Sequence, residues 1–181
     1  MPDTLHMLAP AKVNLFLHVG PLKPNGRHDL DSLVVFAGPE AADQLTAEPS
    51  DILTLSVTGP GAAEAGAGAG ADNLVLKAAR ALRAESGVTQ GAAHAAAALR
   101  LLTRLWDINP AHARAVAPSL GGDVPVALLG QPALMRGEGE RVEPVTLPAP
   151  IPAVLFNPGI ACPTGPVFAA FDAAGGGQDF A

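Results

Sequence analysis

Lys12 and Asn14 are the first residues whose types and spacing could do chemistry, and they lie in the segment APAKVNLFLH at 9–18. In an extended strand, a spacing of two puts both side chains on the same side. A cation and an amide that project together suit a phosphate or another polar ligand. The solvated outer face of an edge strand carries the same pattern, so these two residues alone leave both interpretations open.

A second candidate is the turn GRHDL at 26–30, in which Arg27 precedes His28. A histidine presented beside an arginine could hydrogen-bond the edge of a base or a phosphate. A histidine in a loop can equally be solvated without any ligand, and the turn by itself does not decide between the two.

A third candidate is Asp123, which follows two glycines in the apolar segment LGGDVPV at 120–126. We expect this carboxylate to have a partner, because burying a bare charge is costly. It could cap the N-terminus of a helix. It could also act as a general base, or pair with a catalytic lysine.

The strands that must position these side chains are predicted by alternation of apolar and polar residues. The pattern is clearest at 7–20 (MLAPAKVNLFLHVG), and Asn25-Gly26 then favours a turn, because both residues tolerate positive φ. Further strands are expected at 33–36, 51–58, 133–136, 140–147 and 153–156.

Capping residues and helical spacing of apolar residues predict the helices. Asp72-Asn73 can cap a helix over 74–86 that Gly87 ends, and Asn109-Pro110 opens a helix that ends near Pro118. Two more are expected at 92–106 and 164–173, while 124–129 reads as a buried segment of undecided type. The chain is therefore expected to be mixed α and β.

Composition excludes several classes of protein. The net charge of −6 argues against a broad basic face for nucleic acid. No apolar run is long enough for a membrane span. The single cysteine, Cys162, excludes an internal disulfide and favours a reducing compartment, so the cytoplasm is the expected location. The five histidines are scattered, and no protein-bound metal is predicted.

Taken in order, several segments resemble the kinases that phosphorylate 4-diphosphocytidyl-2-C-methyl-D-erythritol in non-mevalonate isoprenoid synthesis. The segments are APAKVNLFLHV, the G-x-H turn with its following hydrophobic residues, DNLVLKAARAL, LG-x-DVPV, and FNPG at 156–159. These enzymes belong with the galactose, homoserine, mevalonate and phosphomevalonate kinases. The resemblance implies an α+β fold. Residues 1–150 would form an N-terminal kinase domain of the ribosomal-protein-S5 domain 2-like type, and 151–181 the start of a ferredoxin-like C-terminal domain.

The resemblance also implies residue roles at the site of phosphoryl transfer. Asp123 would take the proton from the 2-hydroxyl group as it attacks the γ-phosphate of ATP. Lys12 would pair with Asp123 and steady the hydroxyl, and Asn14 would lie beside it at the methylerythritol end. The implied cofactor is ATP with Mg²⁺, and the implied substrate is a cytidine diphosphate derivative. No nucleic acid or membrane partner is implied, and the oligomeric state is not predicted.

At the cytosine end, His28 would read the base edge. The family usually has a tyrosine before this histidine, stacking on the cytosine, where this chain has Arg27. A guanidinium can stack on a base too. Phe36 would match an aromatic residue on the other side of the base, and Asn73 lies in a segment that contacts the adenine side in relatives.

One motif of the family has no counterpart here. Relatives carry a strand and a loop of the form P-x-x-x-G-x-G-G-G-S-x-D-A-A, whose backbone N–H groups hold the ATP phosphates. In this chain Gly87–Ala93 runs straight into the next helix, which implies that the strand and loop are deleted. The run Gly66–Gly70 is no substitute, because it lacks the Ser and Asp of the motif.

Relatives also continue into a C-terminal domain with a third glycine-rich motif. Three interpretations therefore stay open. The chain could be a small-molecule kinase, or a catalytically inactive truncated homologue that binds a cytidine nucleotide or a protein partner. It could also be a plain α/β interaction module.

Overall fold

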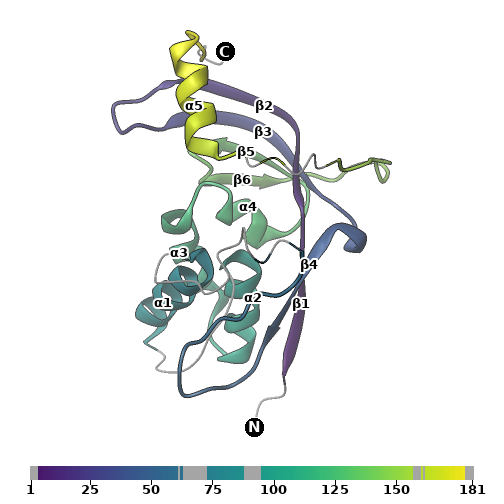
Figure 1. Ribbon diagram of the computed structural model, residues 1–181, viewed down its shortest axis with the longest axis vertical. Coiled ribbons are helices and arrows are strands. Elements are labelled where there is room, and N and C mark those ends of the chain that lie inside the picture. Colours follow the sequence, from purple (N-terminus) through teal and green to yellow (C-terminus); the bar gives the residue numbers. More distant parts are fainter. Residues whose placement is uncertain are drawn as a thin grey trace. The chain divides into compact units, whose positions relative to one another are not determined.

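The computed structural model describes residues 4–60, 62, 73–87, 95–156, 160 and 162–177, and it divides the chain into two compact units. The first unit comprises Met1–Val13 and Phe36–Gln131, and the second comprises Asn14–Val35 and Pro132–Ala181 (Figure 1). The predicted mixture of helices and strands is confirmed. The predicted domain boundary at residue 150 stays a prediction.

Two antiparallel strands line the first unit. β1 (Leu5–Pro10) pairs with β4 (Ala42–Ala47), and the short 3-10 turn η1 (Pro39–Ala41) precedes β4. After Ala11 the chain continues as β2 (Lys12–Leu22). The long strand predicted at 7–20 therefore exists as two strands. The break lies at Ala11, whose N–H donates to the carbonyl of Ala41 and whose carbonyl accepts the N–H of Ala37, each at 2.9 Å.

The strand predicted at 51–58 is wrong. All of these residues are described, and none belongs to a strand. The partner of β1 is β4, whose sequence ADQLTA has only a weak alternating pattern. Alternation is a local property, whereas a strand also needs a neighbour to accept and donate its backbone hydrogen bonds.

The helices of the first unit follow the predicted signals. Their bounds are α1 (Leu74–Ser86), α2 (Ala95–Leu105), α3 (Pro110–Leu120) and α4 (Val124–Leu129). The side chains of Asn73 and Asn109 accept the backbone N–H groups of Val75 and Ala111, each at 2.9 Å, and so cap α1 and α3. Gly87 ends α1 with φ at 73°, as expected. The undecided segment 124–129 is helical.

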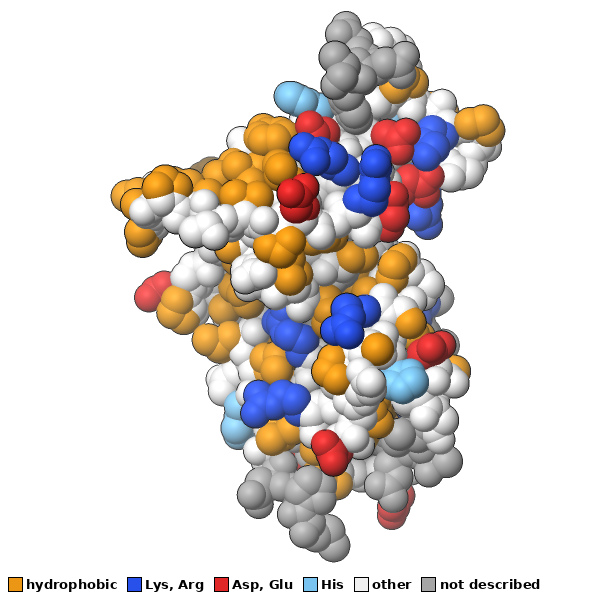
Figure 2. All heavy atoms as spheres, turned by 180° about the vertical axis from the view of Figure 1, so that it is seen from behind, with side chains coloured by type: hydrophobic (Ala, Val, Ile, Leu, Met, Phe, Trp, Pro, Cys, Tyr) orange, Lys and Arg blue, Asp and Glu red, His pale blue; other side chains and the backbone are white. Residues whose placement is uncertain are grey.

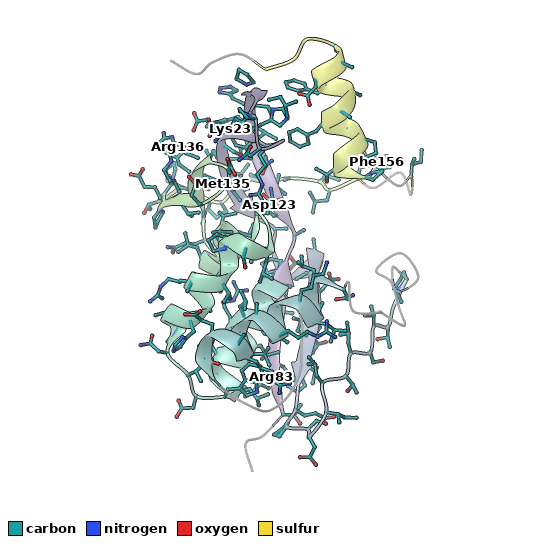
Figure 3. All side chains as sticks on the ribbon, turned by 90° about the vertical axis from the view of Figure 1, so that its left-hand side faces the viewer. Lys23, Arg83, Asp123, Met135, Arg136 and Phe156 are labelled. Carbon is teal, nitrogen blue, oxygen red and sulfur yellow. The ribbon has the colours of Figure 1, made fainter. Side chains whose placement is uncertain are left out.

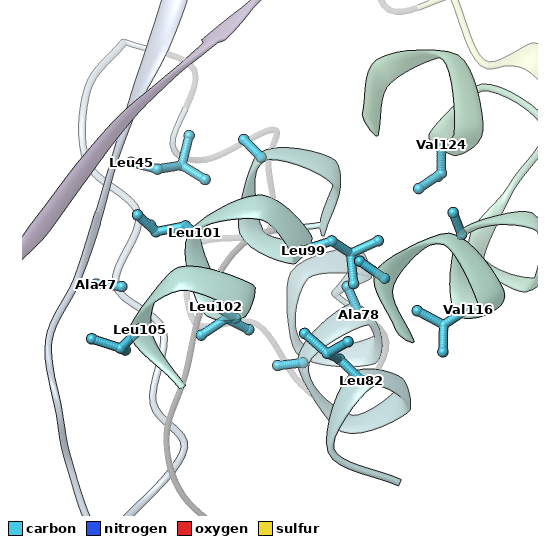
Figure 4. Close-up of a cluster of buried hydrophobic side chains, with 14 residues drawn as sticks. Leu45, Ala47, Ala78, Leu82, Leu99, Leu101, Leu102, Leu105, Val116 and Val124 are labelled. Atoms are coloured by element: carbon cyan, nitrogen blue, oxygen red, sulfur yellow. The ribbon is translucent and has the colours of Figure 1, made fainter. Parts of the chain in front are cut away.

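A core of aliphatic side chains holds these helices together (Figure 4). Leu82 of α1 and Leu99 and Leu102 of α2 have no exposed surface, and β4 adds Leu45 from the strand side. Burial of each large aliphatic side chain contributes about 1.5–3 kcal/mol. The core therefore fixes the positions of the helices, and through them the positions of the loops that join them.

The second unit is built on a four-stranded sheet in the order β2-β3-β5-β6. Its other strands are β3 (His28–Phe36), β5 (Ala133–Gly137) and β6 (Arg141–Pro144), and α5 (Thr164–Ala173) lies along β2 and β3 (Figure 1). The predicted strands at 33–36, 133–136 and 140–147 and the helix at 164–173 are confirmed, with β6 shorter than expected.

The strand predicted at 153–156 is wrong. These residues are described and belong to no strand, and Val154 and Phe156 are 92% and 86% exposed. The apolar run AVLF was the only signal for it, and an apolar run specifies a strand only where a sheet edge is available to pair with it. None of the helices in the described residues has the length and apolar character that a membrane crossing requires.

Replacing Leu82 with Ala is expected to lower the free energy of unfolding by about 2–5 kcal/mol, because it leaves a cavity among close-packed side chains. Leu74→Ala is the matched control in the same helix, since Leu74 is 43% exposed, and it should cost less than about 1 kcal/mol. Urea unfolding followed by circular dichroism measures both. Similar losses in the two variants would contradict the assigned core.

Candidate active site

Lys12 and Asp123 come together within the first unit. The Nζ atom of Lys12 lies 3.3 Å from Oδ1 of Asp123, although the two residues come from distant parts of the chain. Lys12 is the first residue of β2, and Asp123 immediately precedes α4, where Figure 3 labels it. The expectation that these two side chains meet is confirmed by this distance. Their catalytic roles stay predictions.

The turn before α4 holds Asp123 in place. Gly121 has φ at 151° and ψ at 154°, a backbone conformation that residues with a Cβ atom rarely adopt. The N–H of Val124 donates to the carbonyl of Gly121, and the N–H of Ala127 donates to the carbonyl of Asp123, each at 3.0 Å. The backbone of Asp123 is thereby fixed at the start of the helix.

The side chain of Asp123 makes no capping hydrogen bond, so the alternative of a helix cap is wrong, and the carboxylate pairs with Lys12 instead. One premise was wrong: the Asp123 side chain is 63% exposed, so burial is not what requires a partner. The Lys12 side chain is only 22% exposed. An accessible carboxylate beside a largely buried ammonium can accept a proton from a hydroxyl group that approaches from solvent.

His28 begins β3 in the second unit and is only 7% exposed, so the interpretation of a solvated loop histidine is wrong. Its Nδ1 atom lies 2.9 Å from the carbonyl oxygen of Gly20, and its Nε2 atom lies 3.5 Å from Oδ1 of Asp172. The ring is 5.0 Å from that of Phe168 and 6.3 Å from that of Phe171, measured between centroids. Both ring nitrogens therefore face protein oxygens.

Sequence reasoning missed the three α5 residues around His28. Phe168, Phe171 and Asp172 are spaced three and four apart, which places them on one face of a helix. That spacing was readable in the sequence, but nothing local indicated which strand the face would meet. The role of His28 in reading cytosine stays a prediction, and in this arrangement a base reaches Nε2 only by displacing Asp172.

Arg27 belongs to a cluster of charged and polar side chains where the β2–β3 turn meets the β5–β6 turn, which we call the turn cluster: Lys23, Asn25, Arg27, Asp29 and Glu138. Glu138 is its centre. Its carboxylate accepts hydrogen bonds from Nζ of Lys23 and Nδ2 of Asn25, each at 2.8 Å, and from Nη1 of Arg27 at 3.4 Å. Basic and acidic side chains gather on this part of the surface in Figure 2. Stacking of Arg27 on cytosine stays a prediction.

The turn cluster shifts the pKa values of its two central groups. Hydrogen bonds from Lys23 and then Asn25 hold the pKa of Glu138 below its ordinary value of 4.5. Hydrogen bonds to Glu138 and then Asp29 raise the pKa of Lys23 above its ordinary 10.5. Both side chains keep part of their surface in contact with water, so the contribution to stability is small and is screened by salt.

The remaining predicted site residues are Asn14, Phe36 and Asn73, and each lies on a different element or cap. Asn14 is half-buried on β2 and belongs to the second unit, so its place beside the Lys12–Asp123 pair stays a prediction. Phe36 is the half-buried last residue of β3. The Asn73 side chain caps α1, and its predicted place near adenine is untested.

The segments predicted to lack or replace the phosphate loop, 88–93 and Gly66–Gly70, lie outside the described residues. Among the residues that are described, no group of three or more His, Cys, Asp and Glu side chains could hold a metal ion.

Replacing Glu138 with Gln is expected to change how stability depends on pH. Because the folded protein lowers the pKa of Glu138, its contribution is present above pH 4.5 and is lost as the pH falls through the folded value. The variant should therefore be slightly less stable than the parent at neutral pH and equal to it in acid. Urea midpoints between about pH 3 and pH 7 at low salt measure this.

Glu143→Gln on β6 is the control for this measurement, since its side chain is 73% exposed and approaches the guanidinium of Arg136 at 3.7 Å. It should change the pH dependence less than Glu138→Gln does. A pH profile of Glu138→Gln that is parallel to that of the parent would contradict the assigned interactions.

Two relatives that share one name are similar to this chain over most of its length. No protein-family model matches it. It is 63% identical over 191 positions to a 4-diphosphocytidyl-2-C-methyl-D-erythritol kinase of Hyphomonas neptunium, covering 96% of this chain and 63% of the relative. It is 46% identical over 176 positions to the enzyme of the same name from Cereibacter sphaeroides, covering 90% of this chain and 62% of the relative. The chain thus spans less than two thirds of these relatives.

The Hyphomonas alignment is longer than the chain itself, 191 positions against 181 residues. The relative therefore has residues at aligned positions where this chain has none.

A solved structure has the same architecture. The crystal structure of a 4-(cytidine 5'-diphospho)-2C-methyl-D-erythritol kinase matches with a TM-score of 0.72 and 34% identity, over 97% of this chain and 68% of that one. The implied fold is confirmed by this match. With sequence and fold in agreement, the chain belongs to the 4-diphosphocytidyl-2-C-methyl-D-erythritol kinase family.

Proposed function

We propose that the chain is a small-molecule kinase that transfers the γ-phosphoryl group of ATP to the 2-hydroxyl group of 4-diphosphocytidyl-2-C-methyl-D-erythritol. The observation that carries the proposal is the 3.3 Å contact between Lys12 and Asp123. Family membership supplies the substrate, since the relatives are named for this reaction. The cytoplasm is the proposed location.

The pair has a defined task in this reaction. The accessible carboxylate of Asp123 takes the hydroxyl proton while the hydroxyl oxygen forms its bond to the γ-phosphorus, and ADP leaves with the bridging oxygen. The Lys12 ammonium donates hydrogen bonds to the attacking oxygen and keeps it near the carboxylate. Bound ATP would bring Mg²⁺, which neutralises phosphate charge. Asn14 is proposed to contact the methylerythritol end.

The cytidine end of the substrate is proposed to bind at the second unit. Arg27 is exposed enough to stack on a base, and Glu138 restrains its guanidinium. His28 lies against the aromatic ring of Phe168, so a pyrimidine that displaces Asp172 from Nε2 would meet a ring nitrogen beside an aromatic side chain. Phe36 is proposed to face the base, and Asn73 to lie toward adenine.

A second candidate function has support of its own. Relatives have residues at positions where this chain has none, and phosphoryl transfer depends on the backbone groups that position the phosphates. The unpaired segment 51–58, with its strand-like alternation, fits a strand whose neighbour is missing. A catalytically inactive homologue that binds a cytidine nucleotide, or a protein partner, would keep the rest of the fold.

Turnover of the cytidylylated substrate tests the first proposal. Lys12→Ala and Asp123→Asn are each expected to lower the rate by about 100-fold or more, because each removes a group that acts on the reacting hydroxyl. Lys77→Ala on the exposed face of α1 is the control and should keep the parent rate. Parent-like rates in Lys12→Ala and Asp123→Asn would refute the assigned roles.

Calorimetry separates the two candidates if the parent shows no turnover. An active kinase should bind both CDP and a non-hydrolysable ATP analogue with Mg²⁺. The inactive homologue should bind CDP alone, and a plain interaction module should bind neither. Loss of CDP binding in Arg27→Ala, with binding kept in Arg141→Ala, would locate the cytidine end at the β2–β3 turn.

A further inference from the structure

Arg100 of α2 contacts α4, which Asp123 precedes, and β1, which ends two residues before Lys12. Its Nη1 atom donates to the carbonyl oxygens of Ala127 at 2.5 Å and Leu128 at 3.3 Å, both in α4. Its Nε atom faces Sδ of Met7 in β1 at 3.5 Å. One guanidinium therefore touches the helix that follows Asp123 and the strand that leads to Lys12.

The two carbonyl groups lie where a helix leaves acceptors without partners. The last turn of an α-helix has carbonyl oxygens with no N–H group ahead of them. α4 has only six residues and ends at Gly130, whose N–H donates to the carbonyl of Val126 at 3.1 Å. A helix this short has few hydrogen bonds of its own. A bond that fixes its last turn therefore also restrains its first, which Asp123 precedes.

The backbone next to Arg100 leaves space for its guanidinium. A Cβ atom at Gly130 would lie 2.9 Å from Nη1, so the absence of a side chain there leaves room for the group. Loss of contact with water lowers the pKa of Arg100, although an arginine stays protonated at any ordinary pH. A charge withdrawn from water is tolerated where its donors have acceptors, and here Nη1 and Nε have them.

We propose that Arg100 is a positioning residue for Asp123: it holds α4 so that the carboxylate faces the Lys12 ammonium. The expected effect of Arg100 on catalysis rests on the proposed function. Its effect on the position of Asp123 does not. Arg100 touches no reacting group. Its effect passes through the backbone of α4 to Asp123.

The reactivity of the Lys12 amine reports this positioning directly. Reductive methylation of the folded protein, followed for each lysine by mass spectrometry of peptides, measures how readily Lys12 leaves Asp123, because the nitrogen must be released before it reacts. Asp123→Asn gives the Lys12 rate in the absence of the Asp123 carboxylate. Arg100→Met should raise the Lys12 rate several-fold toward that value, with Lys23 in the second unit as the internal reference.

Arg104→Met is the matched control, since Arg104 lies one turn further along α2 and is exposed. It should leave the Lys12 rate unchanged. A purely stabilising role for Arg100 would lower the unfolding midpoint without changing the Lys12 rate of the folded protein. That result, an unchanged Lys12 rate in folded Arg100→Met, would overturn the proposal.

If Arg100→Met does not fold, Arg100→Gln decides, because a glutamine side chain stays polar but ends near the position of Nε, too short to reach the carbonyls that Nη1 bonds. A raised Lys12 rate in this variant supports the proposal, and a parent rate overturns it. Where the parent chain turns over substrate, Arg100→Met should lower kcat while KM for the nucleotide stays the same. A parent without turnover counts against the proposed function alone, since the labelling result still decides the positioning role.

Discussion

The ion pair between Lys12 and Asp123 is the contact on which the proposed chemistry depends. It contributes too little free energy to fix the positions of the two segments that carry these residues. With the Asp123 side chain 63% exposed, such a pair contributes no more than about 1 kcal/mol to folding. The packed leucines of α1 and α2 supply far more and decide where the loops between the helices lie. The geometry of the pair is therefore a consequence of the core, with the Gly121 turn setting the final direction of Asp123.

Local signals were sufficient for most helices. Asn73 and Gly87 mark the ends of α1 through a side-chain acceptor and a left-handed glycine, and Asn109-Pro110 opens α3. These interactions lie within a few residues of each other, so a single sequence contains them. The contact between Lys12 and Asp123 joins distant parts of the chain, so local spacing could not identify the partner of either residue. Only the resemblance to a family predicted this pair.

Long-range pairing explains what could not be predicted. The segment 51–58 alternates well and forms no strand, whereas β4 alternates poorly and pairs with β1 along its whole length. His28 looked like a solvated loop residue, yet α5 covers it with Phe168 and Asp172. In each case the deciding neighbour lies far away in the chain. Family-specific residue roles, by contrast, came from ordered motifs and still await direct tests.

A crystal structure of the chain would test the central claim most directly, through the distance between the Lys12 nitrogen and the Asp123 carboxylate. The account predicts a separation within about 4 Å, the range of an ion pair, with the carboxylate open to solvent. A structure in which the two side chains point to different surfaces, with α4 turned away from β2, would contradict it.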